Sequence, residues 1–176
     1  MVKNGDLDKM TMLFERHHRP LFGFFYHMTG KRDFSEDLMQ TVFYRMLKYR
    51  HSFKGNGEFR NWMYYLAFNV LKDETKKNKR QFFVRDLSEF EDKIEYGELS
   101  DHGIQKEQEL MELKNAMAGL SADERKILIL SKFQRLQYQE IAGILGISEG
   151  AVKVRVHRAF IQLKNIYLKK MSYALQ

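Results

Sequence analysis

The sequence predicts an all-α protein of two small helical domains joined by a flexible acidic linker, the second domain containing a helix-turn-helix. Apolar residues recur with the 3.6-residue period of an amphipathic helix from one end of the chain to the other. Strict apolar-polar alternation, which marks a half-buried strand, is rare, and the one proline is Pro20. A chain of 176 residues, 44% of them hydrophobic, can bury one core or two small ones. We expect a first domain over residues 1–80, a linker over 81–104 and a second domain over 105–176.

The charge balance indicates an anionic partner. The formal net charge is +7, which favours a polyanion such as nucleic acid, or an anionic membrane surface. The absence of cysteine excludes a disulfide framework, thiol catalysis and thiolate zinc sites, and it fits a reducing cytoplasm. The N-terminal stretch MVKNGDLDK lacks an apolar run, and no stretch approaches the roughly 18 apolar residues that a spanning helix needs. We therefore expect a cytoplasmic, unprocessed protein that does not insert into a membrane.

The first domain is expected to begin with two helices. The first covers residues 7–29, with Pro20 as a kink or break. Asp33 and Glu36 match a capping box, which would start a second helix that runs to about residue 51. The apolar face of this second helix carries Leu38, Val42, Met46 and Tyr49.

A third helix is expected over NWMYYLAFNVLKDETKKNKR, residues 61–80, and it has two distinct faces. The first is an ordinary buried stripe: Phe59, Met63, Leu66, Ala67 and Val70. The opposite face carries Asn61, Tyr65, Phe68, Asn69, Lys72, Lys76 and Lys79. Aromatic rings that stack on bases, together with cations that follow the backbone, are how proteins hold single-stranded nucleic acid. We therefore predict a single-strand-binding strip, with Trp62 at its margin: Tyr65, Phe68, Asn69, Lys72 and Lys76.

An acidic segment separates the two domains. Residues 86–101, DLSEFEDKIEYGELSD, hold seven acidic residues against the single Lys93, a local net charge of −6. Such a segment between basic domains is expected to be extended. Helical periodicity resumes near Ile104, and Ser121 with Glu124 forms a capping box for a further helix. The apolar residues of that helix are Ile127, Leu128, Leu130 and Phe133.

The stretch YQEIAGILGISEGAVKVRVHRAFIQLK has the pattern of a helix-turn-helix. Ala142 is the small residue where two helices approach, and Gly146 sits at the turn. The predicted core consists of Ile141, Leu145, Ile147, Val152 and Val156, continued along the second helix by Ala159, Phe160 and Leu163. The other side of that helix and its start form a candidate DNA surface: Ser148, Glu149, Gly150, Lys153, Val154, Arg155, His157 and Arg158.

This candidate surface suits a major groove. Arginine and lysine can read guanine edges or hold phosphates, Val154 can meet a thymine methyl group, and Gly150 lets backbone come close. From Ser148 to the last residue there are six Lys or Arg against one acidic residue, a local net charge of +5. A single run of charge would indicate only a solvated basic face on a helical adaptor. The turn, the core and the basic face together favour DNA binding.

At this point the two domains resemble bacterial sigma factors of the sigma-70 class, specifically the short extracytoplasmic-function group that keeps only regions 2 and 4. In the first domain, SEDLMQTVFYRML resembles the helix that docks on the clamp coiled coil of RNA polymerase. SFKGNGEFRNWMYYLAFNVLKDETKKNKR is similar to the promoter-melting and minus-10 segment. In the second domain, LSADERKILILSKFQRLQYQEIAGILGISEGAVKVRVHRAFIQLK is close to the pattern for minus-35 recognition. The resemblance covers nearly the entire chain.

The resemblance implies a non-catalytic subunit without cofactor or metal, which binds core RNA polymerase and reads both promoter elements while melting DNA. It implies that the loop 52–57 and the start of the third helix hold a base flipped from the minus-10 element, with Asn56, Arg60 and Asn61 as candidates for its edge. It assigns polymerase binding to Asp37, Gln40, Phe43, Arg45 and Lys48. By the same implication the linker threads into polymerase, and an anti-sigma factor covers both domains.

Two positions depart from the family pattern. Val154 stands where relatives often have a small polar residue. Phe68 replaces an arginine that frequently precedes the residue equivalent to Asn69. The promoter sequence is therefore not inferred from the resemblance. In the free protein, the two basic domains are expected to lie against each other or against the linker, which would weaken promoter binding without polymerase.

Three other functions fit parts of the sequence. A dimeric helix-turn-helix regulator would use the same reading helix, but it leaves the aromatic strip unexplained, and a free sigma factor is expected to be monomeric. A nucleic-acid enzyme would need clustered carboxylates or histidines, whereas the six histidines are scattered or point to different faces. Membrane-surface binding by the basic C-terminal helix is disfavoured because its apolar face belongs to the helix-turn-helix core.

Overall fold

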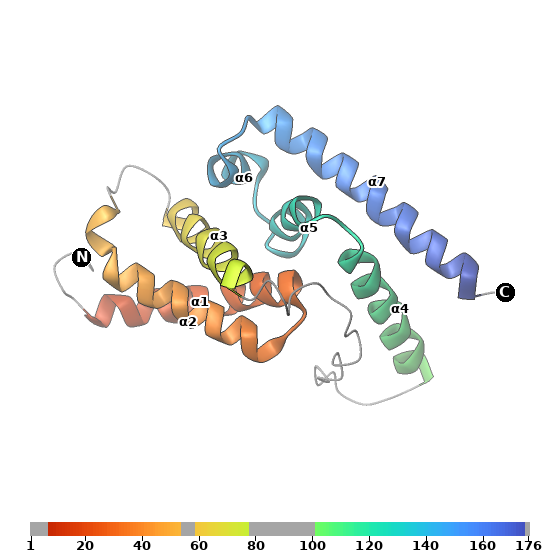
Figure 1. Cartoon of the computed structure of the whole chain (residues 1–176), viewed down its shortest axis with the longest axis horizontal. Coiled ribbons are helices and arrows are strands. Elements are labelled where there is room, and N and C mark those ends of the chain that lie inside the picture. Colours follow the sequence, from red (N-terminus) through yellow and green to blue (C-terminus); the bar gives the residue numbers. More distant parts are fainter. Residues whose placement is uncertain (1–6, 54–58, 78–100, 175–176) are drawn as a thin grey trace.

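The computed structural model describes residues 7–53, 59–77 and 101–174, and every regular element in these ranges is helical. The first lobe comprises α1 (Leu7–Thr29), α2 (Arg32–Lys48), a 3-10 turn (Arg50–Ser52) and α3 (Phe59–Lys77). The second lobe comprises α4 (Asp101–Ala118), α5 (Ala122–Leu128), a π-helical turn (Ile129–Phe133), α6 (Tyr138–Leu145) and α7 (Glu149–Ala174). Figure 1 shows the lobes side by side, with α3 of the first facing α6 of the second. The all-α prediction is confirmed.

Parts of the prediction fall outside the described residues. Asn56, Lys79 and residues 81–100 of the expected linker lie there. Helix α4 begins at Asp101, inside the range 81–104 that was expected to be linker. Apolar periodicity locates helix ends poorly, because a polar first turn contributes nothing to the pattern.

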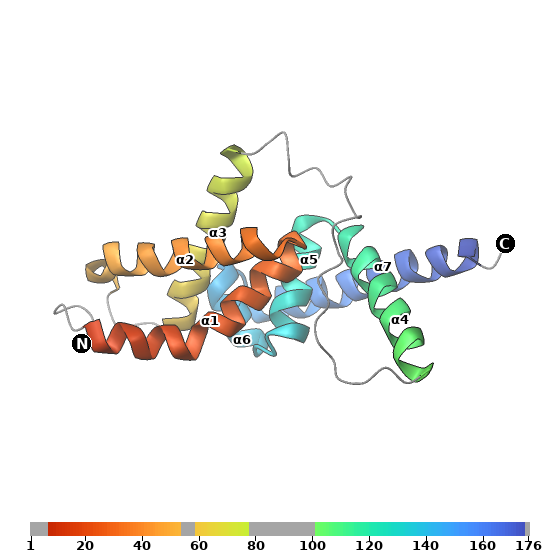
Figure 2. The same cartoon turned by 90° about the horizontal axis from the view of Figure 1, so that it is seen from below.

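The sequence left open whether Pro20 kinks or breaks the first helix. The break is wrong, because α1 continues through the proline. Figure 2 shows α1 bending partway along its length. The helix ends at Thr29. Gly30 follows it with a φ of 72°, in the left-handed region that favours glycine, and its N–H donates to the Tyr26 carbonyl at 2.8 Å. The chain then turns directly into α2.

The capping box expected at the start of α2 is wrong. The helix begins at Arg32 with Lys31 as its N-cap, and no side chain caps it, so Asp33 and Glu36 already lie inside the helix. Glu36 instead accepts a hydrogen bond from Arg32 at 3.4 Å. The helix also ends earlier than expected, at Lys48, and Tyr49 beyond it is exposed rather than part of an apolar face.

Helix α3 buries the stripe that its sequence predicts. Met63, Leu66, Ala67 and Val70 are buried, and Phe59 is half-buried against the same core. The periodicity placed Tyr64 on neither face, yet its side chain is only 2% exposed. The reason is that a second set of helices covers this flank of α3.

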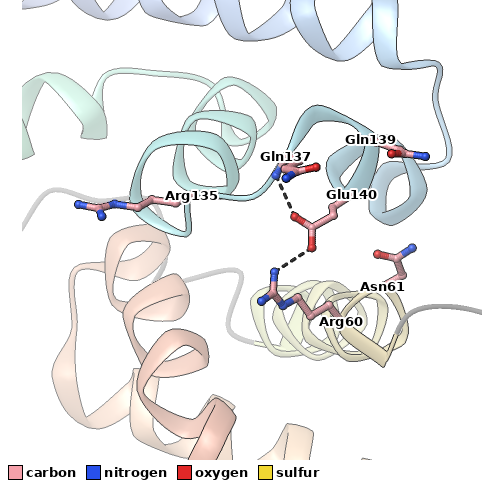
Figure 3. Close-up of a pocket in the computed structure, with 6 residues that line it drawn as sticks. All are labelled: Arg60, Asn61, Arg135, Gln137, Gln139 and Glu140. Carbon is pink, nitrogen blue, oxygen red and sulfur yellow. Dashed lines mark hydrogen bonds and ion pairs between the residues drawn. The ribbon is translucent and has the colours of Figure 1, made fainter.

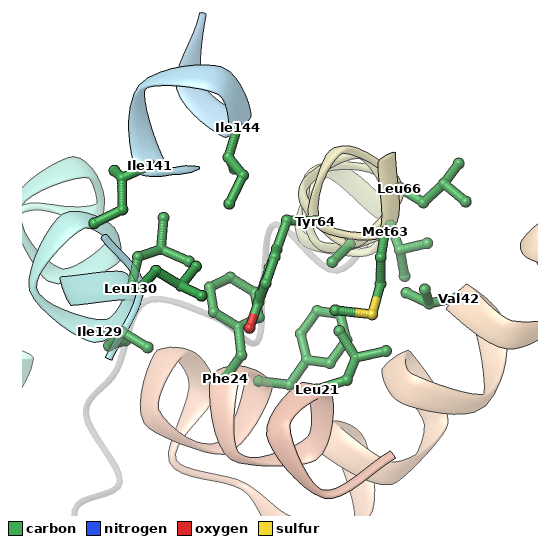
Figure 4. Packing of buried hydrophobic residues seen from close by; sticks show 14 of the residues in the cluster. Leu21, Phe24, Val42, Met63, Tyr64, Leu66, Ile129, Leu130, Ile141 and Ile144 are labelled. Atoms are coloured by element: carbon green, nitrogen blue, oxygen red, sulfur yellow. The ribbon is translucent and has the colours of Figure 1, made fainter. Parts of the chain in front are cut away.

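The buried apolar residues of both lobes form one continuous cluster. In Figure 4, Tyr64 projects from α3 between Phe24 of the first lobe and the side chains Leu130 and Ile144 of the second. The Tyr64 and Phe24 rings meet edge to face, with centroids 5.5 Å apart at 78°. The lobes are therefore joined by a shared core in addition to the linker.

The second lobe begins as its capping signals predict. The Ser121 hydroxyl oxygen accepts from the Glu124 N–H at 3.3 Å, while the Glu124 carboxylate accepts from the Ser121 N–H at 3.0 Å. Two residues expected in the core lie outside it. Phe133 is exposed because the π-helical turn carries it to the surface, where its ring contacts His27 of α1. Phe160 lies at the margin of the apolar side of α7 and is also exposed.

Candidate nucleic-acid interface

The helix-turn-helix prediction is confirmed by α6 and α7. Gly146, with φ of 65°, ends α6, and the Ile147 N–H donates to the Ala142 carbonyl at 3.1 Å. The Ser148 hydroxyl then accepts from the Ala151 N–H at 3.2 Å and so caps α7. Ser148, a predicted DNA contact, is therefore committed at least in part to starting this helix.

Helix α7 has one buried and one exposed side. Val152, Val156 and Ala159 are buried against α5 and α6, which fixes the helix by its apolar side. All the residues predicted to face DNA are exposed: Ser148, Glu149, Gly150, Lys153, Val154, Arg155, His157 and Arg158. A side chain at Gly150 would meet no atom within 4 Å, so the start of the helix offers open space for a close partner. The structure brings this whole set to one accessible surface.

The strip predicted on α3 is divided between two directions. Tyr65, Lys72 and Lys76 are exposed, Tyr65 to 59%, and Asn69 beside them is half-buried. We call these four residues the outer strip. Asn61 and Phe68 are half-buried on the flank of α3 that faces the second lobe. We call these two residues, together with the buried Tyr64 between them, the inner face.

Trp62, predicted at the margin of the strip, is half-buried among aromatic rings. Its ring centroid lies 5.4 Å from that of Phe53 and 6.0 Å from that of Phe59. Phe53 follows the 3-10 turn after α2, so this aromatic group holds that turn against the start of α3. Trp62 thus has a structural role in addition to any contact with nucleic acid.

A polar junction lies between the start of α3 and the start of α6 (Figure 3). Arg60 donates to Glu140 at 2.8 Å, and the other oxygen of Glu140 accepts from the Gln137 N–H at 2.9 Å. The junction borders a hollow of about 660 Å³ that is open to solvent on one side, lined by Arg60, Asn61, Arg135, Gln137, Gln139 and Glu140. The Oδ1 atom of Asn61 is buried there without a hydrogen-bond partner. Arg60 and Asn61, both predicted to read the minus-10 element, are therefore engaged with the second lobe.

The residues predicted to bind polymerase are only partly at the surface. Asp37, Gln40 and Lys48 are exposed along α2. Phe43 is buried, with its ring 4.8 Å from that of Phe14 on α1. Arg45 pairs with Asp73 of α3 at 2.8 Å and so braces α2 against α3. Three of the five side chains are thus directly available on α2.

Sequence reasoning missed the residues that join the two lobes. Tyr64 donates to Gln134 at 3.1 Å, and Arg125 donates to the carbonyl of Met28 at 3.0 Å. Glu140 also belongs to the capping box at the start of α6, and nothing in that local pattern indicates its second contact, with Arg60. Tyr64 lies next to the apolar stripe of α3, and a tyrosine hydroxyl that is buried there needs a hydrogen-bond partner. This was the one sequence feature that could have indicated a contact on that flank of α3.

Stability is expected to depend on pH through His27, which lies at the lobe contact. Burial, and secondarily Lys114, lowers its pKa below the ordinary 6.5, so the folded protein favours the neutral ring. At pH values well above 6.5 the His27 ring is neutral in both the folded and the unfolded state. As the pH falls below 6.5, the unfolded chain takes up a proton more readily than the folded protein, so the free energy of unfolding decreases. We expect the urea midpoint to be lower at pH about 5.5 than at pH about 8, and His27→Gln to flatten the difference. His17 acts in the same direction, because burial, Arg16 and Arg60 lower its pKa. If the dependence of the urea midpoint on pH is unchanged in His27→Gln, the assignment to His27 is contradicted.

Within residues 7–53, 59–77 and 101–174, no group of three or more His, Asp or Glu is placed to hold a metal ion. None of the helices within these ranges has an apolar stretch of the length needed to span a lipid bilayer.

Comparison with protein families identifies two matching segments. Sigma-70 region 2 matches residues 13–81, and Sigma-70, region 4 matches residues 110–163. Among curated relatives, RNA polymerase sigma factor YlaC of Bacillus subtilis (strain 168) is 27% identical over 158 residues, which are 89% of this chain and 91% of that protein. ECF RNA polymerase sigma factor SigW of the same organism is 28% identical over 164 residues, covering 89% of this chain and 88% of SigW.

Two solved structures share the fold. The sigma factor RpoE in complex with the anti-sigma factor NepR, from Bartonella quintana, has a TM-score of 0.71 at 24% identity, over 90% of this chain and 96% of RpoE. CnrH in complex with the cytosolic domain of CnrY has a TM-score of 0.71 at 19% identity, over 94% of this chain and 91% of the CnrH chain. The order of helices in both lobes is therefore one found in proteins with different sequences.

Proposed function

The chain belongs to the sigma-70 family, in its extracytoplasmic-function group, and we propose that its two lobes divide promoter recognition between them. It is a promoter-recognising sigma subunit of RNA polymerase, and it binds core polymerase and promoter DNA. The observation that carries the proposed division is that two exposed surfaces of different chemistry lie on different lobes. The first lobe bears the aromatic and basic outer strip, and the second bears the exposed face of α7.

In this proposal, the face of α7 reads the minus-35 duplex. An α-helix fits the major groove of B-DNA, and the exposed arginines and lysines provide donors for phosphates and guanine edges. Val154 is 48% exposed in the middle of the face and supplies an apolar contact for a thymine methyl group. Gly150 leaves room at the start of the helix for the DNA backbone. Ser148 supports this surface by capping α7.

Arg158→Ala is expected to weaken minus-35 recognition by about 1–3 kcal/mol, because the variant removes a donor fork from the exposed face. The measurement is transcription by the holoenzyme from promoters with intact and with scrambled minus-35 elements. Gln162→Ala, an exposed position further along α7, is the matched control and should leave the ratio unchanged. An equal preference for the intact element in Arg158→Ala and the unmodified chain would remove Arg158 from the reading surface.

We propose that α3 holds the melted minus-10 strand. The outer strip gives one ring and two lysines in a line along the helix, which suits stacking and backbone contact. Arg60 and Asn61 at the start of α3 are the candidates for a flipped base, together with Asn56, which lies outside the described residues. Phe68 is half-buried on the inner face, where the Lys126 ammonium lies over its ring.

Tyr65→Ala is expected to impair promoter melting, since stacking is worth about 1–3 kcal/mol per base. Tyr65 is a better test than Phe68 because it is exposed, so its removal leaves the packing of the core intact. Permanganate reactivity of thymines around the start site reports melting, and Tyr65→Phe should retain it because the ring remains. Normal melting by Tyr65→Ala would remove this ring from the strand-binding surface.

We further propose that α2 docks on polymerase through Asp37, Gln40 and Lys48. Phe43 and Arg45 support that surface from beneath, through Phe14 and Asp73 respectively. Tyr44 is also exposed on the same helix and adds an aromatic contact. The chain itself contributes no catalytic group in this proposal, and polymerase carries out the chemistry.

The direct test mixes the purified chain with sigma-free core polymerase and fragmented genomic DNA. The expected result is melting and transcription from specific sites only when both proteins are present. Binding to intact duplex without core polymerase, no melting with it, and a dimer in solution would favour the alternative, a symmetric helix-turn-helix regulator. The proposed sigma subunit is a monomer when free.

An anti-sigma partner is a further part of the proposal. RpoE, which shares this fold, was solved in complex with the anti-sigma factor NepR. By analogy we propose that a protein of that class restrains this chain by covering surfaces of both lobes. Co-purification of the chain with such a partner, and loss of transcription upon its addition, would test this.

A further inference from the structure

The middle of α1 lies against the start of α3. The half-buried His17 ring of α1 packs on the Phe59 ring, with centroids 5.1 Å apart at an angle of 40°. Phe59 is the first residue of α3, and Arg60 follows it. The pKa of His17 is lowered by burial and by the charges of Arg16 and Arg60, so both guanidinium groups lie close enough to act on the ring. Arginines from two helices therefore flank one histidine.

Only one of these two arginines is neutralised by an ion pair. Arg60 binds Glu140 at 2.8 Å. Within residues 7–53, 59–77 and 101–174, by contrast, none of the ion pairs includes Arg16. The Arg16 side chain is exposed, so its donors face solvent. A guanidinium placed beside a second cation and left without a carboxylate raises the local positive potential, which favours an anionic partner.

We propose that Arg16 binds a backbone phosphate of the melted promoter strand, next to the base that is captured at the start of α3. This inference rests on the proposed function of α3, whose candidates for the flipped base are Arg60 and Asn61. His17 packs on the residue directly before them, so a strand held at the start of α3 runs beside the cation of α1. Helix α1 is thereby part of the DNA interface.

The contact fits a phosphate better than a base. An exposed guanidinium offers a planar fork of donors that matches two phosphate oxygens. The neutral His17 ring beside it can add an N–H donor to the same group. A phosphate contact fixes the position of the strand without reading its sequence. In this arrangement Arg16 holds the strand in place while the start of α3 reads the base.

Arg19 provides a matched control on the same helix. It lies two residues after His17, which places it about 200° around α1 from the side that packs on Phe59. Arg19 is exposed like Arg16, and it has the same side chain. A strand held at the start of α3 should therefore be out of reach of Arg19.

The test measures equilibrium binding of the holoenzyme to labelled fork-junction DNA that carries the single-stranded minus-10 segment of a mapped promoter. Arg16→Ala should bind about three- to tenfold more weakly at about 100 mM salt, because one charge-assisted contact is lost. The plot of log affinity against log salt concentration should become less steep by about 0.7, the value for one phosphate of a single strand. Arg19→Ala should keep both the affinity and the slope.

Three further readouts separate a phosphate contact from a structural role. Arg16→Ala should lose affinity by the same factor for an intact and a substituted minus-10 element, because a backbone contact carries no sequence information. Its urea midpoint should be unchanged, since the side chain is exposed and holds no ion pair among the described residues. Arg16→Lys retains the charge and should retain the salt slope.

The outcomes separate this site from the proposed function. Absence of transcription by the unmodified chain with core polymerase would contradict the sigma proposal itself. Normal transcription by the unmodified chain, with the same DNA affinity and salt slope in Arg16→Ala, would overturn only the phosphate site on α1. Equal losses in Arg16→Ala and Arg19→Ala would also overturn it, because they would indicate the general charge of α1. So would weaker binding of Arg16→Ala to core polymerase without DNA, which would assign Arg16 to the polymerase interface.

Discussion

Tyr64→Ala is expected to lower the free energy of unfolding by about 3–5 kcal/mol, the usual cost of truncating a buried aromatic side chain. Tyr64 is almost fully buried, and its ring packs edge to face on Phe24. Its hydroxyl donates to Gln134, so the variant also leaves that amide oxygen without its donor. The loss should be large because Tyr64 belongs to the core of both lobes at once.

Urea denaturation of Tyr64→Ala, followed by far-UV circular dichroism, measures this effect. Tyr64→Phe keeps the ring and should cost only about 1 kcal/mol, the net value of one hydrogen bond. Tyr65→Ala, the exposed neighbour, should change stability by less than about 0.5 kcal/mol. A loss in Tyr64→Ala as small as that in Tyr65→Ala would show that the ring is not part of the packed core.

The buried stripe of α3 was predictable from sequence because local geometry decides it. In a helix, residues three and four apart lie on one side. Spacing alone was therefore enough to predict the buried stripe of Met63, Leu66, Ala67 and Val70. Tyr64 falls outside that stripe and is buried only because α6 lies across it. No local pattern encodes a contact with Gln134, which is 70 residues away in sequence.

The same distinction separates the two capping boxes. Ser121 and Glu124 form one because a loop precedes the helix and both side chains reach its free N–H groups. Asp33 and Glu36 have the same spacing, but α1 turns so tightly into α2 at Gly30 that the helix starts before Asp33. A capping pattern therefore depends on where the preceding helix ends, which tertiary packing helps to set.

At the candidate site, sequence reasoning predicted the exposed face of α7 but not the division of α3. All the predicted α7 residues are exposed, because the helix-turn-helix core accounts for the other side. On α3, a helical projection placed Phe68 with Tyr65 on one face. Phe68 turned out to face Lys126 of the second lobe, whereas Tyr65 faces outward. The difference arises from the contact between the lobes, which no local pattern in the sequence of α3 encodes.

Arg125 forms a polar link between the lobes. Its guanidinium donates to three carbonyls around the end of α4: Met117 at 3.0 Å, Ala118 at 2.7 Å and Leu120 at 3.2 Å. Through Nη1 it also donates to the carbonyl of Met28 near the end of α1, at 3.0 Å. Burial lowers the pKa of Arg125, but an arginine stays charged at neutral pH. One side chain therefore serves carbonyl groups of two helix ends in different lobes.

Arg125→Ala is expected to cost about 2–4 kcal/mol, because it leaves several partly buried carbonyls without a donor. Arg125→Lys keeps the charge but not the planar fork, so it should recover less than half of the loss. Trp62, the one tryptophan, lies in the first lobe, so its fluorescence follows that lobe while Arg125 lies in the second. If the shared core couples the lobes, the Trp62 transition in urea should shift with the far-UV circular dichroism transition in Arg125→Ala. A Trp62 transition that stays in place while the overall helical signal shifts would mean that the lobes unfold separately, and the contact between the lobes would then contribute little to stability.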